Sequence, residues 1–112
     1  MTTLQYKSYP VRLHCERYSN KRPAIQLILA NDTEEAIAGE LITTATVNLP
    51  NEPIHSDEIA VKSYSENEGM LDWLWHNNII ERQPTRYIPS GFVRIPICKL
   101  TPAGKLLCGV KK

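Results

Sequence analysis

One stretch of the chain has the pattern of an α-helix, whereas most of the other apolar runs alternate or are rich in β-branched residues. The predicted helix covers about residues 66–77. Its apolar side chains are spaced so that they fall on one face, and these are Met70, Leu71, Leu74 and Trp75. A chain with many strands and one helix does not fit alternating β–α–β units, so the sequence predicts an α+β fold.

The flanks of this stretch predict where the helix begins and ends. Ser65 and Glu68 are three positions apart, as in a capping box, where each side chain accepts a hydrogen bond from the backbone N–H of the other residue. Asn78 predicts a left-handed stop, because asparagine tolerates a positive φ better than most residues do.

Five segments have the composition of strands, and they are residues 10–18, 24–30, 41–49, 58–64 and 92–100. Turn residues between the first two segments predict a hairpin, and the long polar connection after the second predicts a loop. Pro96 has no backbone N–H, which predicts that the last strand lies at a sheet edge or carries a bulge.

The expected architecture is a mainly antiparallel sheet of about five strands with one helix packed on one face. A chain of 112 residues has the length of one domain. We place a single α+β domain in residues 1–100 and a basic C-terminal tail in residues 101–112.

Composition points to the cytoplasm. The chain has no run of about 18 apolar residues, so no membrane-spanning segment is predicted. Its first residues lack the apolar core of a signal peptide, which predicts that it is not secreted. Cys15, Cys98 and Cys108 are odd in number and widely spaced, which is typical of reduced thiols rather than of a disulfide framework.

Charge is distributed unevenly along the chain, although the net charge is only +1. Residues 1–31 carry five basic and one acidic side chain, residues 32–81 one basic and eleven acidic, and residues 82–112 seven basic and none acidic. Either the segments neutralise one another on folding, or they form opposed faces that steer partners. The last segment, with Tyr87 and Phe92 interleaved, supports nucleic-acid binding as an alternative function. The residues for this alternative are Arg82, Arg86, Arg94, Lys99 and Lys105.

The sequence lacks the patterns of the common cofactor and metal sites. Its five glycines are isolated, so neither a phosphate-binding loop nor a dinucleotide fingerprint is present. Its histidines and cysteines show neither of the close spacings, Cys-x-x-Cys or His-x-x-x-His, of common zinc sites. We expect no cofactor, no metal and no recognisable catalytic residue. The sequence does not decide whether a nucleophile and a base that are distant in the chain meet after folding.

Polar and aromatic residues around the predicted helix start form a candidate binding surface. Glu66 and Asn67 follow the predicted cap and are expected to point to solvent, with Trp73 beside them and partly exposed. A partly exposed tryptophan beside polar groups has the composition of a binding hot spot. The alternative is that these side chains satisfy neighbouring backbone groups and cover a loop. The candidate residues are Asn48, Tyr64, Glu66, Asn67, Trp73 and Ser90.

Several blocks of the sequence are distinctive when taken together, namely Thr44–Pro50, Ile59–Lys62, Tyr64–Leu71 and Pro89–Leu100. With them, the chain from about residue 12 to residue 100 resembles a family of small uncharacterised bacterial proteins. Members of this family recur on plasmids, phages and other mobile elements, and their domain has no established activity. The resemblance implies a mobile-element context and no mechanism.

The sequence therefore predicts a small non-catalytic interaction protein, for instance a mobile-element-borne modulator that binds a host protein. The first alternative is an accessory protein that binds nucleic acid through its basic C-terminal third. The second alternative is a small enzyme with an unrecognised site. The interaction protein is favoured because the sequence lacks the residue patterns that are typical of nucleic-acid-binding proteins and of enzymes.

Overall fold

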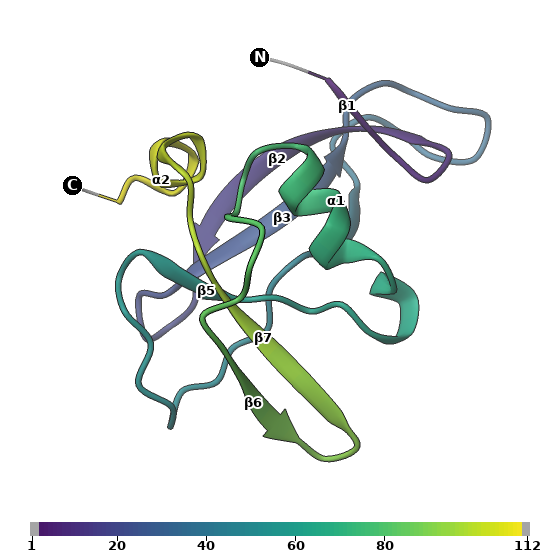
Figure 1. The fold of residues 1–112 in the computed structure, drawn as a ribbon. Helices are drawn as coiled ribbons and strands as arrows, with labels where there is room; N and C mark the ends of the chain where they lie inside the picture. The colour runs from purple at the N-terminus through teal and green to yellow at the C-terminus, as the bar shows by residue number, and fades with distance from the viewer. Residues whose placement is uncertain (1–2, 111–112) are drawn as a thin grey trace.

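The computed structural model describes residues 3–110 and has an α+β fold built mostly from antiparallel strands, as predicted (Figure 1). Within these residues it contains seven strands in two sheets and two α-helices. The finer prediction of one sheet of about five strands with one helix is therefore wrong. Two of the strands and one of the helices are short or lie in segments without a clear periodic pattern. The number of elements predicted from the sequence is therefore too low.

The first sheet has the order β1-β2-β3-β4, with antiparallel neighbours throughout. Its strands are β1 (Leu4–Tyr6), β2 (Tyr9–Arg17), β3 (Pro23–Leu29) and β4 (Leu41–Thr44). The predicted hairpin of β2 and β3 is confirmed, with Val11 opposite Leu29. Strand β1 escapes prediction because three residues are too few to show an alternation.

The second sheet has the order β5-β7-β6, and its strands are β5 (Glu58–Ala60), β6 (Arg86–Ser90) and β7 (Val93–Lys99). Strand β7 is central in its sheet, so the prediction that it is an edge strand is wrong, although its ladder with β5 ends at Ile97 and Pro96 pairs with β6 alone. The carbonyl of Pro96 accepts the Val61 N–H at 3.0 Å, one residue past the end of β5. The N–H and C=O of one strand residue point to the same side, so the missing donor of Pro96 faces a place where β5 has already ended.

The two sheets meet where the chain leaves β4. Thr46 forms an isolated antiparallel bridge with Val61. The N–H of Lys62 donates to the carbonyl of Ala45 at 2.8 Å. The segment after β4 in one sheet therefore runs beside the segment after β5 in the other.

The helix predicted over residues 66–77 is formed in two pieces. A 3-10 turn spans Ser65–Asn67, and α1 spans Met70–His76. Gly69 lies between them with a φ of 88°, a left-handed conformation that glycine adopts without strain. The α-helix therefore begins four residues later than the periodicity indicates.

The predicted capping box of Ser65 and Glu68 is wrong. Ser65 lies inside the 3-10 turn with a φ of 57°, and the α-helix starts only after Glu68. The hydroxyl of Ser63 instead accepts the N–H of Leu71 at 3.0 Å in the first turn of α1. Capping is thus supplied by a serine two positions earlier than predicted.

The predicted stop at Asn78 is confirmed. Its φ is 61°, and its N–H donates to the carbonyl of Trp75 at 3.0 Å. The N–H of Ile79 donates to the carbonyl of Leu74 at 2.9 Å. This pair of bonds is a Schellman motif, and it turns the chain back so that Ile79 is buried.

The second helix, α2 (Pro102–Cys108), lies in the segment where the sequence predicts a basic tail at 101–112. The hydroxyl of Thr101 accepts the N–H of Gly104 at 3.0 Å, and Pro102 occupies the first turn, where no backbone donor is needed. Residues 111 and 112 of the predicted tail lie outside the described part of the chain.

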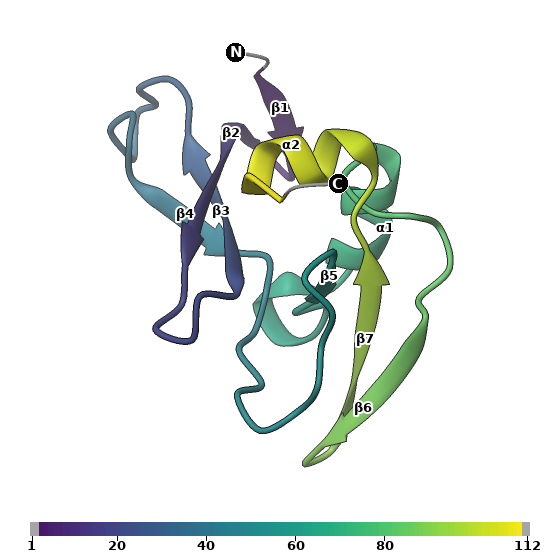
Figure 2. The same ribbon diagram turned by 90° about the vertical axis from the view of Figure 1, so that its left-hand side faces the viewer.

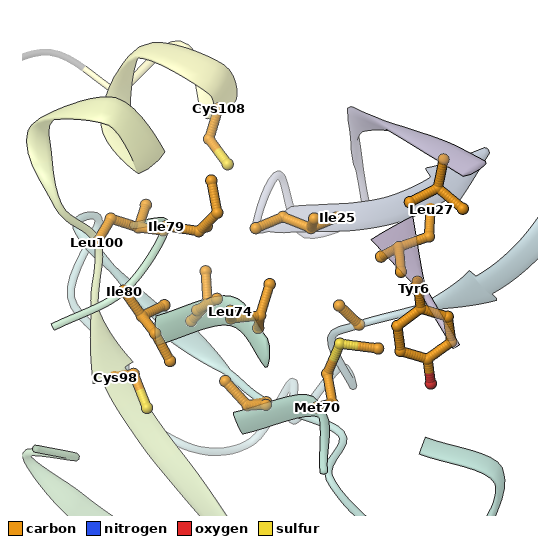
Figure 3. Packing of buried hydrophobic residues seen from close by; sticks show 14 residues of the cluster. Tyr6, Ile25, Leu27, Met70, Leu74, Ile79, Ile80, Cys98, Leu100 and Cys108 are labelled. Atoms are coloured by element: carbon orange, nitrogen blue, oxygen red, sulfur yellow. The ribbon is translucent and has the colours of Figure 1, made fainter. Parts of the chain in front are cut away.

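Both helices lie on the side of the four-stranded sheet that faces the second sheet (Figure 2). The main core takes side chains from both sheets and both helices, as Figure 3 shows. Its members include Tyr6, Ile25, Leu27, Met70, Leu74, Ile79, Ile80, Cys98, Leu100 and Cys108. A smaller cluster lies under the second sheet and contains Ala60, Ile88, Ile95 and Ile97. Neither helix found in residues 3–110 has the length and apolar character needed to cross a membrane.

Candidate binding groove

A groove of about 490 Å³ opens where the two sheets meet. One wall is formed by β4, which is the terminal strand of its sheet, and by the residues that follow it. The other wall is the segment between β5 and α1. The groove is lined by Tyr18, Ile42, Thr43, Thr44, Thr46, Val47, Asn48, Lys62, Tyr64 and Glu66.

Hydrogen bonds orient several polar side chains of this groove. The hydroxyls of Tyr18 and Thr46 are 3.0 Å apart, and the Thr46 hydroxyl also accepts the N–H of Ile25 at 3.3 Å. The side-chain amide of Asn20 donates to the side-chain Oδ1 of Asn48 at 3.0 Å. Side chains that are already held in place lose less conformational entropy when a partner binds.

Asn67 fixes one wall of the groove to the other. Its side chain is fully buried, so the expectation that it points to solvent is wrong. Its Nδ2 donates to the carbonyl of Thr44 at 2.7 Å, and its Oδ1 accepts the hydroxyl of Thr43 at 2.5 Å. The bond to the Thr44 carbonyl is of the kind that a neighbouring strand would make at the edge of β4, and the bond to Thr43 joins two side chains.

The charged end of the groove is an ion pair between Lys62 and Glu66, with Nζ and Oε2 2.8 Å apart. The hydrogen bond with Glu66 raises the pKa of Lys62, and the same bond lowers the pKa of Glu66. Both side chains are therefore held in their charged forms at neutral pH. Lys7 adds a further bond, from its Nζ to the backbone carbonyl of Glu66 at 2.9 Å.

The structure brings three of the six sequence-predicted site residues together. Asn48, Tyr64 and Glu66 line the groove, although Asn48 is distant from the other two in the sequence. Asn67 lies behind the groove wall, where its role is structural.

The remaining two predicted residues lie elsewhere. The indole Nε1 of Trp73 donates to the carbonyl of Gln5 at 2.7 Å, and its ring meets Tyr6 edge-on at 5.4 Å between centroids. Trp73 therefore holds β1 against α1. Ser90 is the last residue of β6, at the turn of the β6–β7 hairpin, and is not among the residues that line the groove.

The five basic residues of the nucleic-acid alternative lie on several different elements of the fold. Arg94 lies over the ring of Tyr87 at 4.8 Å on the β6–β7 hairpin, whereas Arg82 lies over Trp75 at 5.0 Å beside α1. Lys99 ends β7 and Lys105 belongs to α2.

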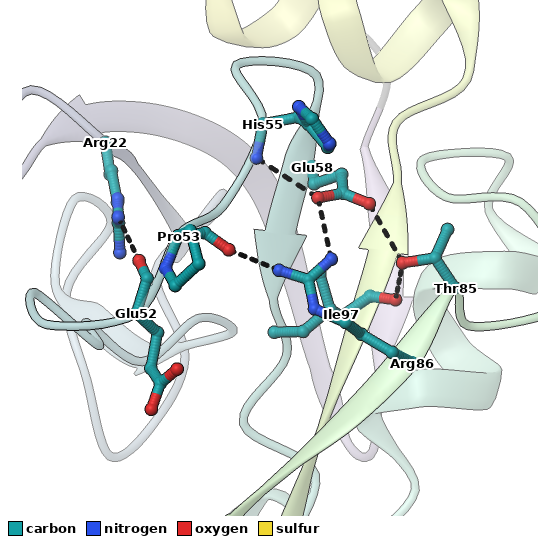
Figure 4. Close-up of polar contacts among 8 residues, drawn as sticks. All are labelled: Arg22, Glu52, Pro53, His55, Glu58, Thr85, Arg86 and Ile97. Atoms are coloured by element: carbon teal, nitrogen blue, oxygen red, sulfur yellow. Dashed lines mark hydrogen bonds and ion pairs between the residues drawn. The ribbon is translucent and has the colours of Figure 1, made fainter.

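Arg86, the fifth of these residues, is part of a structural network around the buried carboxylate of Glu58 (Figure 4). Arg86 Nη1 is 3.3 Å from Glu58 Oε1, and Arg86 Nη2 donates to the carbonyl of Pro53. The carboxylate also accepts the His55 N–H at 3.1 Å and the Thr85 hydroxyl at 2.9 Å. Burial raises the pKa of Glu58, but these bonds and the nearby guanidinium outweigh it and leave the pKa below its ordinary value.

A larger cleft, of about 570 Å³, lies between the β2–β3 turn, residues 54–56 and the end of α2. Two arginines line it, but their guanidinium groups already bind backbone carbonyls. Arg17 donates to Cys108, and Arg22 donates to Leu49 at 2.5 Å. Asn48, Tyr64 and Glu66, three of the sequence-predicted site residues, line the groove and not this cleft, so we take the groove as the candidate site.

Tyr18 and Thr46 are groove residues that sequence analysis misses. Tyr18 ends the first predicted strand and Thr46 lies in the middle of another, so both have the pattern of ordinary strand residues. The bond between the two hydroxyls joins Tyr18 to Thr46, and the long-range bridge between Thr46 and Val61 places both beside the other wall of the groove. No local signal in the sequence encodes that bridge.

Within residues 3–110, no group of three or more His, Cys, Asp or Glu side chains is placed to hold a metal ion. No protein-family model, curated protein or solved structure matches this chain. The geometry of the groove is accordingly the basis for a functional proposal.

Proposed function

We propose that the protein is a non-catalytic interaction protein that binds a segment of a partner protein in the groove between β4 and residues 62–66. One observation carries the proposal. Asn48, Tyr64 and Glu66 converge with hydrogen-bonded hydroxyls on one open groove at the junction of two sheets. Such a set of oriented polar groups around a tyrosine is typical of a binding surface.

The electrostatics of the groove support recognition more than acid–base chemistry. A general acid or base works best with a pKa near the pH of the reaction. Lys62 and Glu66 shift in the opposite sense, with the pKa of the lysine raised and that of the glutamate lowered through their mutual hydrogen bond. The pair presents two fixed charges, which can orient a partner of complementary charge.

The groove chemistry indicates the kind of partner segment. Glu66 is exposed and complements a basic side chain, while Asn48 offers an amide to a backbone or amide group. Tyr64, beside the Lys62 ammonium at 5.7 Å from its ring centroid, offers an amphipathic contact surface. The family resemblance supports a host protein as the source of this segment.

The proposal is tested by capturing partners from host lysate with the tagged protein. We expect Asn48→Ala, Tyr64→Ala and Glu66→Ala each to reduce the amount captured about fivefold or more, as hot-spot truncations do. Half of each lysate is treated with nuclease, which separates direct protein capture from capture through nucleic acid.

Leu106→Ala is the matched control, because Leu106 is 84% exposed on α2 and is not among the groove-lining residues. It should leave capture unchanged. Melting temperatures of all variants are compared, so that loss of capture is not confused with loss of fold. Undiminished capture by all three groove variants would place the binding surface elsewhere.

A second candidate function, nucleic-acid binding, is favoured by the tip of the β6–β7 hairpin. Phe92 is fully exposed there, and the guanidinium of Arg94 lies 4.8 Å from the ring centroid of Tyr87. Exposed aromatic rings beside arginine are the groups on which single-stranded bases stack. This candidate uses Arg94 but not Arg86, which is bound to Glu58.

Binding to a labelled single-stranded oligonucleotide distinguishes this second candidate. If it is right, Phe92→Ala should weaken binding by roughly tenfold, in line with the loss of one stacking contact. Arg94→Ala should weaken binding and lower its dependence on salt concentration. Equal binding by the wild type and both variants would remove the hairpin as a nucleic-acid site.

A further inference from the structure

Two of the three cysteines meet across the interface between α2 and the four-stranded sheet. Cys15 lies on β2 and is half-buried, and Cys108 is the last residue of α2 and is buried. Figure 3 shows the Cys108 side chain directed from α2 into the core. The two thiols lie close enough for each to be the main cause of the shift in the other's pKa, although they are separated by most of the length of the chain.

The end of α2 is held in place independently of the thiols. Arg17, two residues after Cys15, donates from its guanidinium to the backbone carbonyl of Cys108. At the other end of the helix, Gly104 approaches the carbonyl of Ile79 so closely that an added Cβ would lie 2.2 Å from the oxygen. The position of Cys108 beside β2 is therefore built into the packing of α2 on the sheet.

The surroundings give the two thiols different reactivities. The hydrogen bond from Cys108, the positive charge of Arg17 and the backbone of Ala24 together lower the pKa of Cys15 to about 7, against the opposing effect of burial. The same bond and burial raise the pKa of Cys108. Burial beside Glu58 raises the pKa of Cys98 to about 12. Cys15 is the thiol that is partly ionised near neutral pH and reachable from solvent, which is what nucleophilic attack requires.

We propose that Cys15 and Cys108 form a reversible intramolecular disulfide when a low-molecular-weight disulfide, such as oxidised glutathione, is the oxidant. This site is separate from the proposed binding groove, since neither cysteine lines it. In a reducing compartment both thiols stay free, as they are in the part of the chain that the structure describes.

The reaction has two exchange steps. The Cys15 thiolate attacks one sulfur of the small disulfide, so that a mixed disulfide forms on Cys15 and one small thiolate leaves. Cys108 then gives its proton to that thiolate and attacks the sulfur of Cys15, which breaks the mixed disulfide and releases the second small thiolate. The net change oxidises two protein thiols to one disulfide and reduces the small disulfide to two thiols.

The first step helps the second. The negative charge on the Cys15 sulfur is one of the causes that raise the pKa of Cys108. That charge disappears when the mixed disulfide forms, so Cys108 ionises more readily at the moment when it must attack. The product ties the C-terminal helix α2 covalently to β2, with the bond buried at the edge of the main core.

The test is a peptide map of the full chain after incubation with oxidised glutathione, acid quenching and alkylation of the remaining thiols. We expect a chain lighter by two hydrogen atoms, a cross-linked peptide containing Cys15 and Cys108, and alkylation of Cys98 alone. Reduced glutathione should reverse the change. Glutathione retained on Cys15, dimers joined through Cys15, or alkylation of both cysteines would each overturn the proposal.

Variants separate the two steps. Cys15→Ser should abolish the reaction, Cys108→Ser should stop it at a stable mixed disulfide on Cys15, and Cys98→Ala should react like the wild type. Circular dichroism checks that each variant is folded. If Cys108→Ser does not fold, the wild-type peptide map still decides the question, because the cross-linked peptide is either present or absent.

Discussion

Asn67 shows how one polar side chain joins two parts of this fold. It is fully buried, and its amide bonds both Thr43 and Thr44 at the edge of β4. From the sequence, an asparagine after a helix cap is expected on the surface. Its burial follows from the 3-10 turn at Ser65–Asn67, which replaces the first turn of the predicted helix and directs this side chain inward.

The first prediction concerns this residue. Asn67→Ala should lower the free energy of unfolding by about 2 kcal/mol, because it leaves the Thr44 carbonyl and the Thr43 hydroxyl without their buried partner. Urea unfolding measures the change. Asn51→Ala, at an exposed turn position, is the control and should stay within about 0.5 kcal/mol of the wild type. Equal midpoints for the two variants would contradict the structural role.

The second prediction concerns Glu58 and pH. The pKa of Glu58 is below its ordinary value in the folded state, so its stabilising contribution is present above the unfolded-state pKa of about 4.3 and is lost as pH falls through the folded-state pKa. Glu58→Gln should therefore cost about 2 kcal/mol at neutral pH and less at acid pH. The wild type should lose stability more steeply than the variant below about pH 4.5.

Thermal unfolding between neutral and acid pH checks this second prediction. Thr85→Val keeps the carboxylate and removes one of its hydrogen bonds, so its effect should be smaller than that of Glu58→Gln. Parallel stability curves for the wild type and Glu58→Gln across the acid range would show that the network around Arg86 does not hold the carboxylate in its charged form.

At the scale of elements, the local sequence pattern predicts those features that depend on neighbouring residues alone. Alternation in β2 and the turn after it predict the β2–β3 hairpin, and Asn78 predicts the end of α1. The start of α1 is misplaced because Gly69 at positive φ interrupts a pattern that is otherwise continuous. Helix α2 is short and contains Pro102 and Gly104, so its formation depends on a surface that only the folded chain provides.

The third prediction separates two serines near α1. Ser63→Ala should lower stability by about 1 kcal/mol, because the Ser63 hydroxyl accepts the N–H of Leu71 in the first turn. Ser65→Ala should change stability by less than about 0.5 kcal/mol, since the predicted capping box does not form. Urea midpoints of the two variants decide the point, and the reverse order would restore Ser65 as the cap.

The fourth prediction concerns the packing of α2. Gly104→Ala would normally favour a helix, but here the new methyl group would lie 2.2 Å from the carbonyl oxygen of Ile79 and 3.0 Å from Leu100 Cδ2. We expect a loss of about 3 kcal/mol, at the upper end for overpacking, because backbone must move. Leu106→Ala, on the exposed face of α2, should be nearly neutral. A melting temperature of Gly104→Ala at or above the wild-type value would show that α2 is not packed as described.

At the scale of the whole molecule, the groove exists only because two sheets meet. The bridge between Thr46 and Val61 and the bond from Lys62 to Ala45 place residues of β4 beside the approach to α1. The sequence indicates polar residues that are not needed to fill the core. Three of these candidates line the groove. The sequence does not indicate Tyr18 or Thr46, because the contacts that select them join distant segments.

The structure also shows where the acidic and basic segments of the chain meet. The basic last third meets the acidic middle third where half-exposed Arg86 pairs with the buried carboxylate of Glu58. Arg94 remains beside Tyr87 on the exposed hairpin, away from that network. Tyr87, Phe92 and Arg94 do not line the groove, so the groove and the hairpin tip are tested as separate candidate surfaces.

The central claim is that a protein partner binds in the groove, and site-specific photocross-linking tests it most directly. A benzophenone amino acid replaces Tyr64 in one variant and Tyr87 in another, since both are tyrosines but only Tyr64 lines the groove. With the partner obtained by capture, the account predicts abundant cross-linking from position 64 and little from position 87. Cross-linking mainly from position 87 would contradict it and place the partner on the hairpin.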